Sequence, residues 1–235
     1  MLDELDALGL RNDTLVVMLS DHGWHLGEYA MWEKRTVWEL GTRVPMMIRA
    51  PWLAEYEATR GAHSRALVEA VDVYRTVCDA MGVALPAADT VPVDGVSLLP
   101  LLRDPARATV KDAALSMHPR CAHPSMPAYG ARGQKGGRDN TCLEVERTDF
   151  TWMGFSMRTD RWRYTEWVGW NGTALLPIWE QRRAVELYDH LHDTGAWTDA
   201  DKFENINLAP SASPQLLEQL SAQLHAAYAY EPQSP

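Results

Sequence analysis

The sequence has little positive charge. Among its 235 residues, 22 Lys and Arg stand against 32 Asp and Glu, which gives a formal net charge of −10. Because proteins bind nucleic acids by neutralising phosphates with a basic surface, this deficit excludes a nucleic acid as the expected partner. An anionic substrate would need a local cationic pocket in an otherwise acidic protein.

Long apolar runs and paired cysteines are also absent. No run of about 18 or more apolar residues occurs, so no transmembrane helix is expected. The acidic, amphipathic start of the chain does not resemble a signal peptide, and the compartment stays open. Cys78, Cys121 and Cys142 lie far apart without a CxxC pair, so neither a zinc site nor a disulfide framework is expected.

Hydrophobic residues make up 46% of the chain, enough for one medium domain or two small ones. Residues 1–108 are predicted to form a partial α/β sheet. A helix over 2–10 precedes an apolar run at 14–19, which is rich in β-branched residues and typical of a strand buried on both faces of a parallel sheet. Residues 44–48 predict a second buried strand.

A helix is predicted over residues 66–81, with Gly82 at its C-terminal cap. Apolar residues recur along this segment at helical spacing and predict one buried face. These residues are Leu67, Val71, Tyr74, Cys78 and Met81.

Residues 109–235 are predicted to form a small α+β unit with an antiparallel sheet. The segment 118–150 is rich in His, Pro, Gly and Arg and predicts a long surface loop. Near-alternating residues over 155–167 predict an antiparallel hairpin. A final helix is predicted from Pro214, with Ser213 as its N-cap. Its buried stripe is expected to comprise Leu217, Leu220 and Leu224.

The tripeptide Asp21-His22-Gly23 directly follows the first predicted strand. In open α/β sheets, ligand sites collect at the carboxyl ends of strands, so a carboxylate and an imidazole are well placed there. Gly23 would allow the sharp turn that lets both side chains address one ligand. Taken alone, the tripeptide is weak evidence, since a polar turn is the commoner explanation.

The wider pattern resembles the type I sulfatases of the alkaline-phosphatase-like superfamily. The stretch from Asp21 to Pro45 is similar to their metal- and sulfate-binding segment, and Asp94–Leu102 is similar to the segment that closes their large domain. Residues 153–169 and 186–189 are similar to the C-terminal subdomain of iduronate-2-sulfatases, the closest pattern. The resemblance covers nearly the whole chain, except the loop around 121–150 and the last twenty or so residues.

This resemblance implies a sulfate-ester hydrolase whose substrate is a sulfated uronate or another glycosaminoglycan-type saccharide. Asp21 and His22 match the positions that hold a divalent cation, usually Ca²⁺, and Asp21 is the stronger ligand because hard cations prefer oxygen. Lys34 matches the lysine that pairs with the sulfate group and stabilises developing charge. Trp24 matches an aromatic residue near the sugar. A shared sulfate would place the Asp21 carboxylate and the Lys34 ammonium on the order of 5–9 Å apart.

Other residues have simpler explanations. Trp32, Trp38 and Trp52 are expected to pack rather than bind sugar, because Trp is heavily buried on average. His25 is expected to face solvent, and Asn171-Gly172-Thr173 fits a glycosylation sequon. Asp72 and Glu186 are expected to be structural. The arginines of the hairpin are expected to protect a solvated edge strand; they are Arg158, Arg161 and Arg163.

The sulfatase nucleophile is missing. Such enzymes use a formylglycine made from Cys or Ser within Cys/Ser-x-Pro-Ser-Arg, and no such motif occurs here. The segment Cys121–Ser125 is only a superficial echo, because its proline comes one place late. We expect the chain to be the C-terminal portion of a sulfatase, inactive alone and lacking the N-terminal half of the catalytic domain. Two alternatives stay open: an inactive anion- or glycan-binding module, and a metal-dependent phosphodiesterase of the same superfamily.

Overall fold

The structure is a computed structural model in which residues 2–87, 91–121, 142 and 145–229 are described. None of its helices, within these residues, is both long and apolar enough to cross a membrane.

The chain divides into two compact units. Unit 1 comprises Met1–Asp21 and Val44–Ala114, and unit 2 comprises His22–Arg43 and Leu115–Pro235. The predicted first domain, 1–108, includes residues 22–43, which in the structure cluster with the second unit instead.

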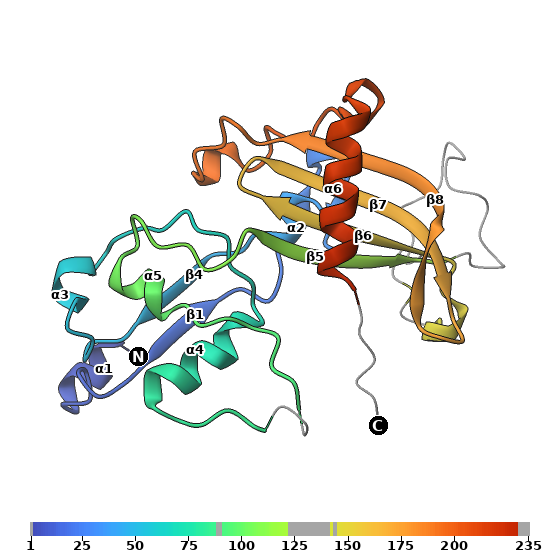
Figure 1. The fold of residues 1–235 in the computed structure, drawn as a ribbon. Helices are drawn as coiled ribbons and strands as arrows, with labels where there is room; N and C mark the ends of the chain where they lie inside the picture. Colours follow the sequence, from blue (N-terminus) through green and yellow to red (C-terminus); the bar gives the residue numbers. More distant parts are fainter. Residues whose placement is uncertain (1, 88–90, 122–141, 143–144, 230–235) are drawn as a thin grey trace. The chain divides into compact units, whose positions relative to one another are not determined.

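Unit 1 is built around a two-stranded ribbon of β1 (Val16–Leu19) and β4 (Met46–Arg49) (Figure 1). The strands are antiparallel, with Val16 opposite Arg49 and Leu19 opposite Met46. Four helices complete the unit: α1 (Leu2–Ala7), α3 (Tyr56–Thr59), α4 (Asp72–Met81) and α5 (Leu99–Arg103).

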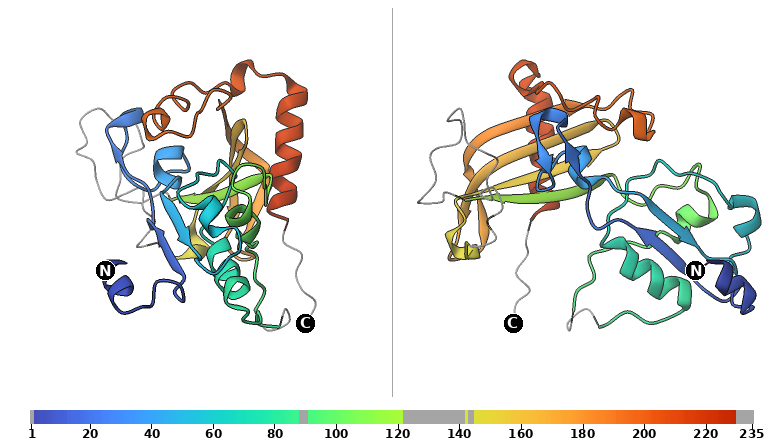
Figure 2. Two further views of the ribbon diagram at one scale, coloured as in Figure 1. Left: turned by 90° about the vertical axis from the view of Figure 1, so that its left-hand side faces the viewer. Right: turned by 180° about the vertical axis from the view of Figure 1, so that it is seen from behind.

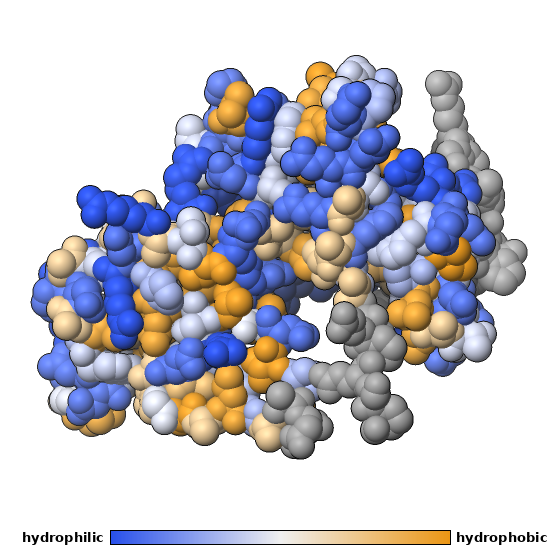
Figure 3. Space-filling model, in the orientation of Figure 1, coloured by the Kyte–Doolittle hydropathy of each residue, from blue (hydrophilic) through white to orange (hydrophobic). Residues whose placement is uncertain are grey.

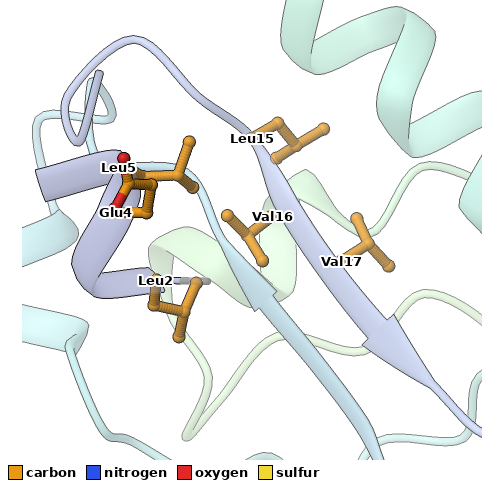
Figure 4. Close-up of a pocket in the computed structure, with 6 residues that line it drawn as sticks. All are labelled: Leu2, Glu4, Leu5, Leu15, Val16 and Val17. Carbon is orange, nitrogen blue, oxygen red and sulfur yellow. The ribbon is translucent and has the colours of Figure 1, made fainter. Parts of the chain in front are cut away.

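The strands of unit 1 correct two predictions. Both were expected in a parallel sheet, but within the described residues they pair only with each other and antiparallel. Burial on both faces is also wrong, because Met18 and Met47 are exposed. An apolar pocket of about 420 Å³ lies between α1 and β1 (Figure 4). It is lined by Leu2, Glu4 and Leu5 of α1, by Leu15 just before β1, and by Val16 and Val17 of β1. Figure 3 shows further apolar surface over this unit.

Helix α4 begins six residues later than predicted. Residues 66–71 are not helical, because the Asp72 carboxylate accepts the backbone N–H of Glu69 at 2.7 Å and Lys111 pairs with both acidic side chains. Gly82 ends the helix in the left-handed conformation, as predicted. Of the predicted buried face, Cys78 is buried as expected, but Val71, Tyr74 and Met81 are exposed. The polar residues Asp72 and Thr76 are buried beside Cys78 instead.

Asp72 is structural, as predicted. Its side chain is fully buried, accepts the backbone N–H of Val96 at 2.9 Å and lies 2.8 Å from the Lys111 ammonium. Thr76 accepts the backbone N–H of Leu98 at 2.9 Å. These bonds tie α4 to the segment that leads into α5, because a buried carboxylate must be paired.

Unit 2 is a three-layered structure with an antiparallel sheet in the middle. The sheet has the order β5-β6-β7-β8. Its strands are β5 (Ala113–Arg120), β6 (Trp152–Thr159), β7 (Trp162–Asn171) and β8 (Leu176–Asp189). Helix α6 (Pro214–Ala227) covers one face, and the segment 22–43 lies against the other, as the two views of Figure 2 show. Beyond the segment 22–43, the described residues of unit 2 also form short 3₁₀ turns, namely η3 (Arg147–Asp149), η4 (Trp197–Asp199) and η5 (Ala209–Ser211).

The predicted hairpin and final helix are confirmed. β6 and β7 pair antiparallel, with Arg158 opposite Arg163. Ser213 caps α6 by accepting the backbone N–H of Leu216. Leu220 and Leu224 are buried beneath it, whereas Leu217 is only half-buried.

A buried glutamate joins α6 to the sheet. Glu166 of β7 accepts from the Tyr164 hydroxyl at 2.6 Å and lies 2.9 Å from Nε2 of His225. Burial acts to raise the pKa of Glu166, but the hydrogen bonds from Tyr164, His225 and Ser221 outweigh it and lower that pKa. The carboxylate is therefore held ionised between helix and sheet.

The predicted loop 118–150 is shorter than expected. Residues 118–120 belong to β5 and 147–149 to η3, while most of the interval lies outside the described residues. Its ends are joined by a disulfide between Cys121 and Cys142, whose Cα atoms are 5.7 Å apart. The expectation that no cysteines pair was wrong, because two cysteines far apart in sequence meet only when the chain folds.

Candidate active site

The segment after β1 carries the residues that the sequence predicts for chemistry. Asp21 ends unit 1 and is exposed, and His22 begins unit 2. Gly23 donates its N–H to the Gly41 carbonyl at 3.1 Å. A Cβ on Gly23 would lie 1.9 Å from the carbonyl oxygen of Leu40. Close backbone packing therefore requires glycine here.

His22 and Lys34 meet in the structure. Nζ of Lys34 lies 2.7 Å from Nε2 of His22, and Nδ1 of His22 lies 2.8 Å from the Gly23 carbonyl oxygen. A carbonyl only accepts, so the imidazole proton is assigned to Nδ1, and Nε2 accepts from the ammonium. Histidines that bind metals are held in the same way, with the second ring nitrogen donating to a backbone carbonyl. The distance between Asp21 and Lys34 stays a prediction, because the two residues belong to different units.

Lys34 lies on a strained stretch of backbone. Six non-glycine residues in the described part of the chain have positive φ, and four of them fall within 29–35. They are Tyr29 (φ 55°), Ala30 (57°), Glu33 (68°) and Arg35 (80°). Each costs on the order of 1–3 kcal/mol and persists only where surrounding contacts hold it. Such strain concentrates at ligand sites, so it supports the sequence-based choice of this segment.

A short hairpin in this segment has one buried face and one exposed face. β2 (His25–Leu26) pairs with β3 (Trp32–Glu33), which places Leu26 opposite Trp32. Leu26 and Trp32 are 67% and 68% exposed, whereas His25 on the alternate face is fully buried. The turn between the strands is η1 (Glu28–Ala30).

His25 does not face solvent, contrary to the prediction. Its Nε2 lies 2.8 Å from Oγ1 of Thr36, and its ring packs edge-on against Tyr29 and Trp38. Burial lowers the pKa of His25 below its ordinary value, against the opposing effect of Glu28. The ring is therefore a neutral internal anchor for both ends of the hairpin.

Arg163 of β7 fastens the end of this segment to the sheet. The residue is only 2% exposed. Its guanidinium donates to the Val37 carbonyl at 2.8 Å, to the Glu39 carboxylate at 2.5 Å and to Glu204. The second oxygen of Glu204 accepts the backbone N–H of Glu39 at 2.6 Å, next to the start of helix α2 (Glu39–Thr42). Burial alone would lower the pKa of Arg163, but Glu204 and Glu39 raise it.

Two of these carboxylates and a nearby buried histidine have the spacing of metal ligands. One ligand atom from each of Glu39, His190 and Glu204 lies within 4.8 Å of the others. The Arg163 guanidinium pairs with both carboxylates, so the positive charge that a metal would supply is already present. Burial acts to raise the pKa of Glu204, but Arg163 and His190 outweigh it and lower that pKa. The cluster is a structural ion network.

The arginines of the hairpin do not protect an edge strand. β6 and β7 each have a neighbour on both sides. Arg158 is largely buried and reaches Asp193 at 3.4 Å, and Arg163 is fully buried. Only Arg161 is exposed, where it pairs with Asp189 at 2.7 Å. Arg158 and Arg163 are buried because carboxylates from distant segments, those of Glu39, Asp193 and Glu204, pair with them.

The remaining predicted residues divide between packing and exposure. Glu186 is structural as predicted: it accepts from the indole N–H groups of Trp38 at 2.8 Å and Trp167 at 2.7 Å. Trp32, predicted to pack, is instead 68% exposed, and Trp52 is 38% exposed. Trp24 is also exposed, with its ring centroid 6.0 Å from that of His22. Asn171, in the predicted sequon, accepts the backbone N–H of Thr173 at 3.0 Å.

Sequence reasoning missed the residues that support the site. Nothing near Glu39 or Glu204 in the sequence indicates that Arg163 pairs with both, because the three lie far apart along the chain. His25 did leave a signal: it alternates with exposed Trp24 and Leu26, and alternation places it on the inner face.

The chain is similar to known proteins in sequence and in fold. The profile of the sulfatase family matches residues 1–83. Human iduronate 2-sulfatase is 30% identical over 85% of this chain. The structure of a phosphonate monoester hydrolase from Silicibacter pomeroyi superposes on 96% of this chain with a TM-score of 0.65 and 23% identity. That of BT4656, in complex with its substrate D-glucosamine-2-N,6-O-disulfate, superposes on 99% with a TM-score of 0.60 and 21% identity.

The chain is shorter than these relatives. It spans 41% of human iduronate 2-sulfatase, and 37% and 39% of the two solved chains. The solved structures share its mixed α/β fold, and the curated relative shares its sequence along most of its length. In both sequence and fold, the chain is similar to the sulfatase family.

Proposed function

We propose that this chain contributes the cation- and sulfate-binding side of a sulfate-ester hydrolase. The observation that carries the proposal is the contact between His22 and Lys34, because it joins two of the four predicted site residues and Lys34 lies on a strained segment. We propose a sulfated uronate or another glycosaminoglycan-type saccharide as the substrate. Its support is the similarity to iduronate 2-sulfatase.

His22 fits a cation ligand. Its Nδ1–H is taken up by the Gly23 carbonyl, which aims the lone pair of Nε2 away from the backbone. Asp21 and His22 would hold the divalent cation, and family resemblance makes Ca²⁺ the expected ion, with Asp21 as the harder ligand. When bound, the cation would neutralise charge on the sulfate oxygens.

Lys34 would supply the second positive charge. Its ammonium is compact, carries three donors and sits on a flexible stem, so it can leave Nε2 of His22 for a sulfate oxygen. The folded backbone around Lys34, with positive φ at four positions of 29–35, sets the position from which its side chain extends. Charge that develops on the leaving oxygen would then be stabilised by a group already in position.

The nucleophile does not come from these 235 residues. They contain no Cys/Ser-x-Pro-Ser-Arg motif, so the formylglycine that the family uses must come from sequence outside this chain. The same fact favours a second candidate function, that of an anion- or glycan-binding module without turnover. Both candidates require Lys34 to bind the sulfated ligand.

The test measures binding and turnover separately. We expect the purified chain with Ca²⁺ to bind a sulfated uronate and to release no sulfate from it. Lys34→Ala should weaken binding by about tenfold or more, since a charge-assisted contact is lost. Lys202→Ala, which removes an exposed lysine paired with Asp199, is the matched control.

Equal affinity of Lys34→Ala and the unchanged chain would end the proposal. Turnover by the chain alone would show that the missing motif is not essential. With the rest of a sulfatase catalytic domain supplied, Lys34→Ala should lower turnover by about 100-fold or more. If the chain supplemented in this way binds the saccharide but releases no sulfate, the binding module is the favoured function.

A further inference from the structure

Trp32 lies on the exposed face of the β2–β3 hairpin, beside the backbone of Gly27. A Cβ on Gly27 would lie 3.5 Å from Cζ2 of the Trp32 ring and 3.9 Å from two further ring atoms. These are ordinary van der Waals distances, so the indole lies beside the Gly27 backbone, and it is the φ of 120° that favours glycine at this position. Leu26 stands opposite on the paired strand. One side of the ring is supported, and 68% of the residue stays exposed.

This supported ring is close to the proposed sulfate site. One residue separates Trp32 from Lys34, so their Cα atoms lie within about 7 Å. Trp24 carries a second exposed indole, 6.0 Å from the His22 ring between centroids. Apolar surface and cationic charge therefore occur side by side on one short hairpin.

The exposure of Trp32 needs an explanation. Tryptophan is heavily buried on average, and exposed apolar patches beside polar groups mark binding sites. Trp38, six residues later, is half-buried and hydrogen-bonded to Glu186. Trp32 contacts Gly27 and is otherwise exposed. The buried contacts of His25 before it and of Val37 after it do not cover its ring.

We propose that Leu26 and Trp32 form a stacking platform for the sugar ring next to the one that carries the sulfate. This inference rests on the proposed function. The C–H face of a pyranose is apolar and matches an indole face, while Lys34 and His22 attract the anionic end of the same saccharide. The platform would make the site selective for a saccharide chain over a single sulfated sugar.

Two probes separate the platform from the sulfate site. One is the methyl glycoside of a sulfated uronate, and the other is a disaccharide with the same sulfated uronate at its end. Trp32→Ala should weaken disaccharide binding by about tenfold, the size of one aromatic stacking contact, and leave monosaccharide binding unchanged. Trp32→Phe should keep most of the affinity. Trp52→Ala, in unit 1, should affect neither probe.

The outcomes distinguish this inference from the proposed function. If Lys34→Ala weakens both probes while Trp32→Ala weakens neither, the sulfate site stands and the platform is wrong. Equal losses for both probes in Trp32→Ala would also overturn the platform. If Trp32→Ala changes only the sedimentation coefficient, the surface is a protein contact instead. An unchanged chain that binds neither probe would overturn both proposals.

Discussion

His25 shows how one residue holds the site segment. The imidazole is fully buried, joined to Thr36 and enclosed by Tyr29 and Trp38. Protonation would place a charge in this apolar surrounding, and burial lowers the pKa of His25 for that reason. The anchor that keeps Lys34 near His22 is therefore sensitive to acid.

His25 should make the stability of unit 2 depend on pH. Its ordinary pKa of 6.5 is lowered in the folded state, so below about pH 6.5 the unfolded state binds a proton that the folded state does not. Stability should fall as pH drops from 6.5 to the folded-state pKa and then level off. His25→Phe should remove this part of the pH dependence, although losing the Thr36 bond costs about 1 kcal/mol.

Urea unfolding between pH 7.5 and pH 5 measures this effect. His63→Gln, at an exposed histidine of unit 1, should keep the pH dependence of the unchanged chain. The same slope in His25→Phe and in the unchanged chain would show that His25 does not remain neutral.

The candidate site residues come from short-range sequence patterns. Asp21, His22 and Lys34 lie within 14 positions of one another, and their types and spacing match the sulfatase segment. Which of them meet was not predictable from spacing alone, since four positive φ values fold the chain around Lys34. The platform of Leu26 and Trp32 was missed because average burial argued for packing.

At the scale of elements, the site segment is held by the antiparallel sheet of unit 2. Arg163 reaches from β7 to the Val37 carbonyl and the Glu39 carboxylate, and Glu204 bonds both Arg163 and the Glu39 backbone. Strain of several kcal/mol in 29–35 must be offset by such anchors. The C-terminal sheet therefore contributes to the site by holding the segment that carries His22 and Lys34 in place.

Removing the Arg163 charge should destabilise the protein strongly. Arg163→Leu would remove the guanidinium that bonds both buried carboxylates, and the loss of one partner of a buried pair typically costs about 3–5 kcal/mol. Glu39 would keep only its longer contacts with Arg43 and Arg158, and Glu204 its contact with His190. The stability of Arg163→Lys should lie between that of the unchanged protein and that of Arg163→Leu, because an ammonium keeps the charge but cannot form the forked hydrogen bonds of a guanidinium. Arg161→Leu is the control on the same hairpin, since it removes only an exposed pair with Asp189.

Urea denaturation of the three variants tests this account. We expect a large loss for Arg163→Leu and no measurable loss for Arg161→Leu. If the two variants lost equal stability, the buried network would not be the anchor described here.

Elements were predictable where local signals suffice. The hairpin of β6 and β7 follows from alternation, and α6 follows from Ser213, Pro214 and spaced leucines. The parallel sheet was wrong because an apolar run does not reveal the direction of its partner strand. The predicted start of α4 was six residues early; at its actual start Asp72 is buried and paired with Lys111, 39 positions further along the chain. Long-range ion pairs leave no periodic pattern.

At the scale of the whole molecule, unit 1 presents apolar surface that its own residues leave uncovered. Met18 and Met47 are directly opposite each other on β1 and β4, and they are 47% and 57% exposed. Within the described residues each strand has only one partner, so each also has an open edge. Exposed apolar faces beside open edges promote association between copies.

The purified chain should therefore self-associate through this ribbon. We expect its sedimentation coefficient to rise with concentration, and the double substitution Met18→Lys and Met47→Glu to reduce that rise. Opposite charges at facing positions keep a favourable cross-strand pair, so the ribbon should survive the change. Ile206→Lys, which charges an exposed apolar residue of unit 2, should leave association unchanged. If the Ile206 variant alone became monomeric, the apolar contact would lie on unit 2, and the ribbon would not be the surface through which copies meet.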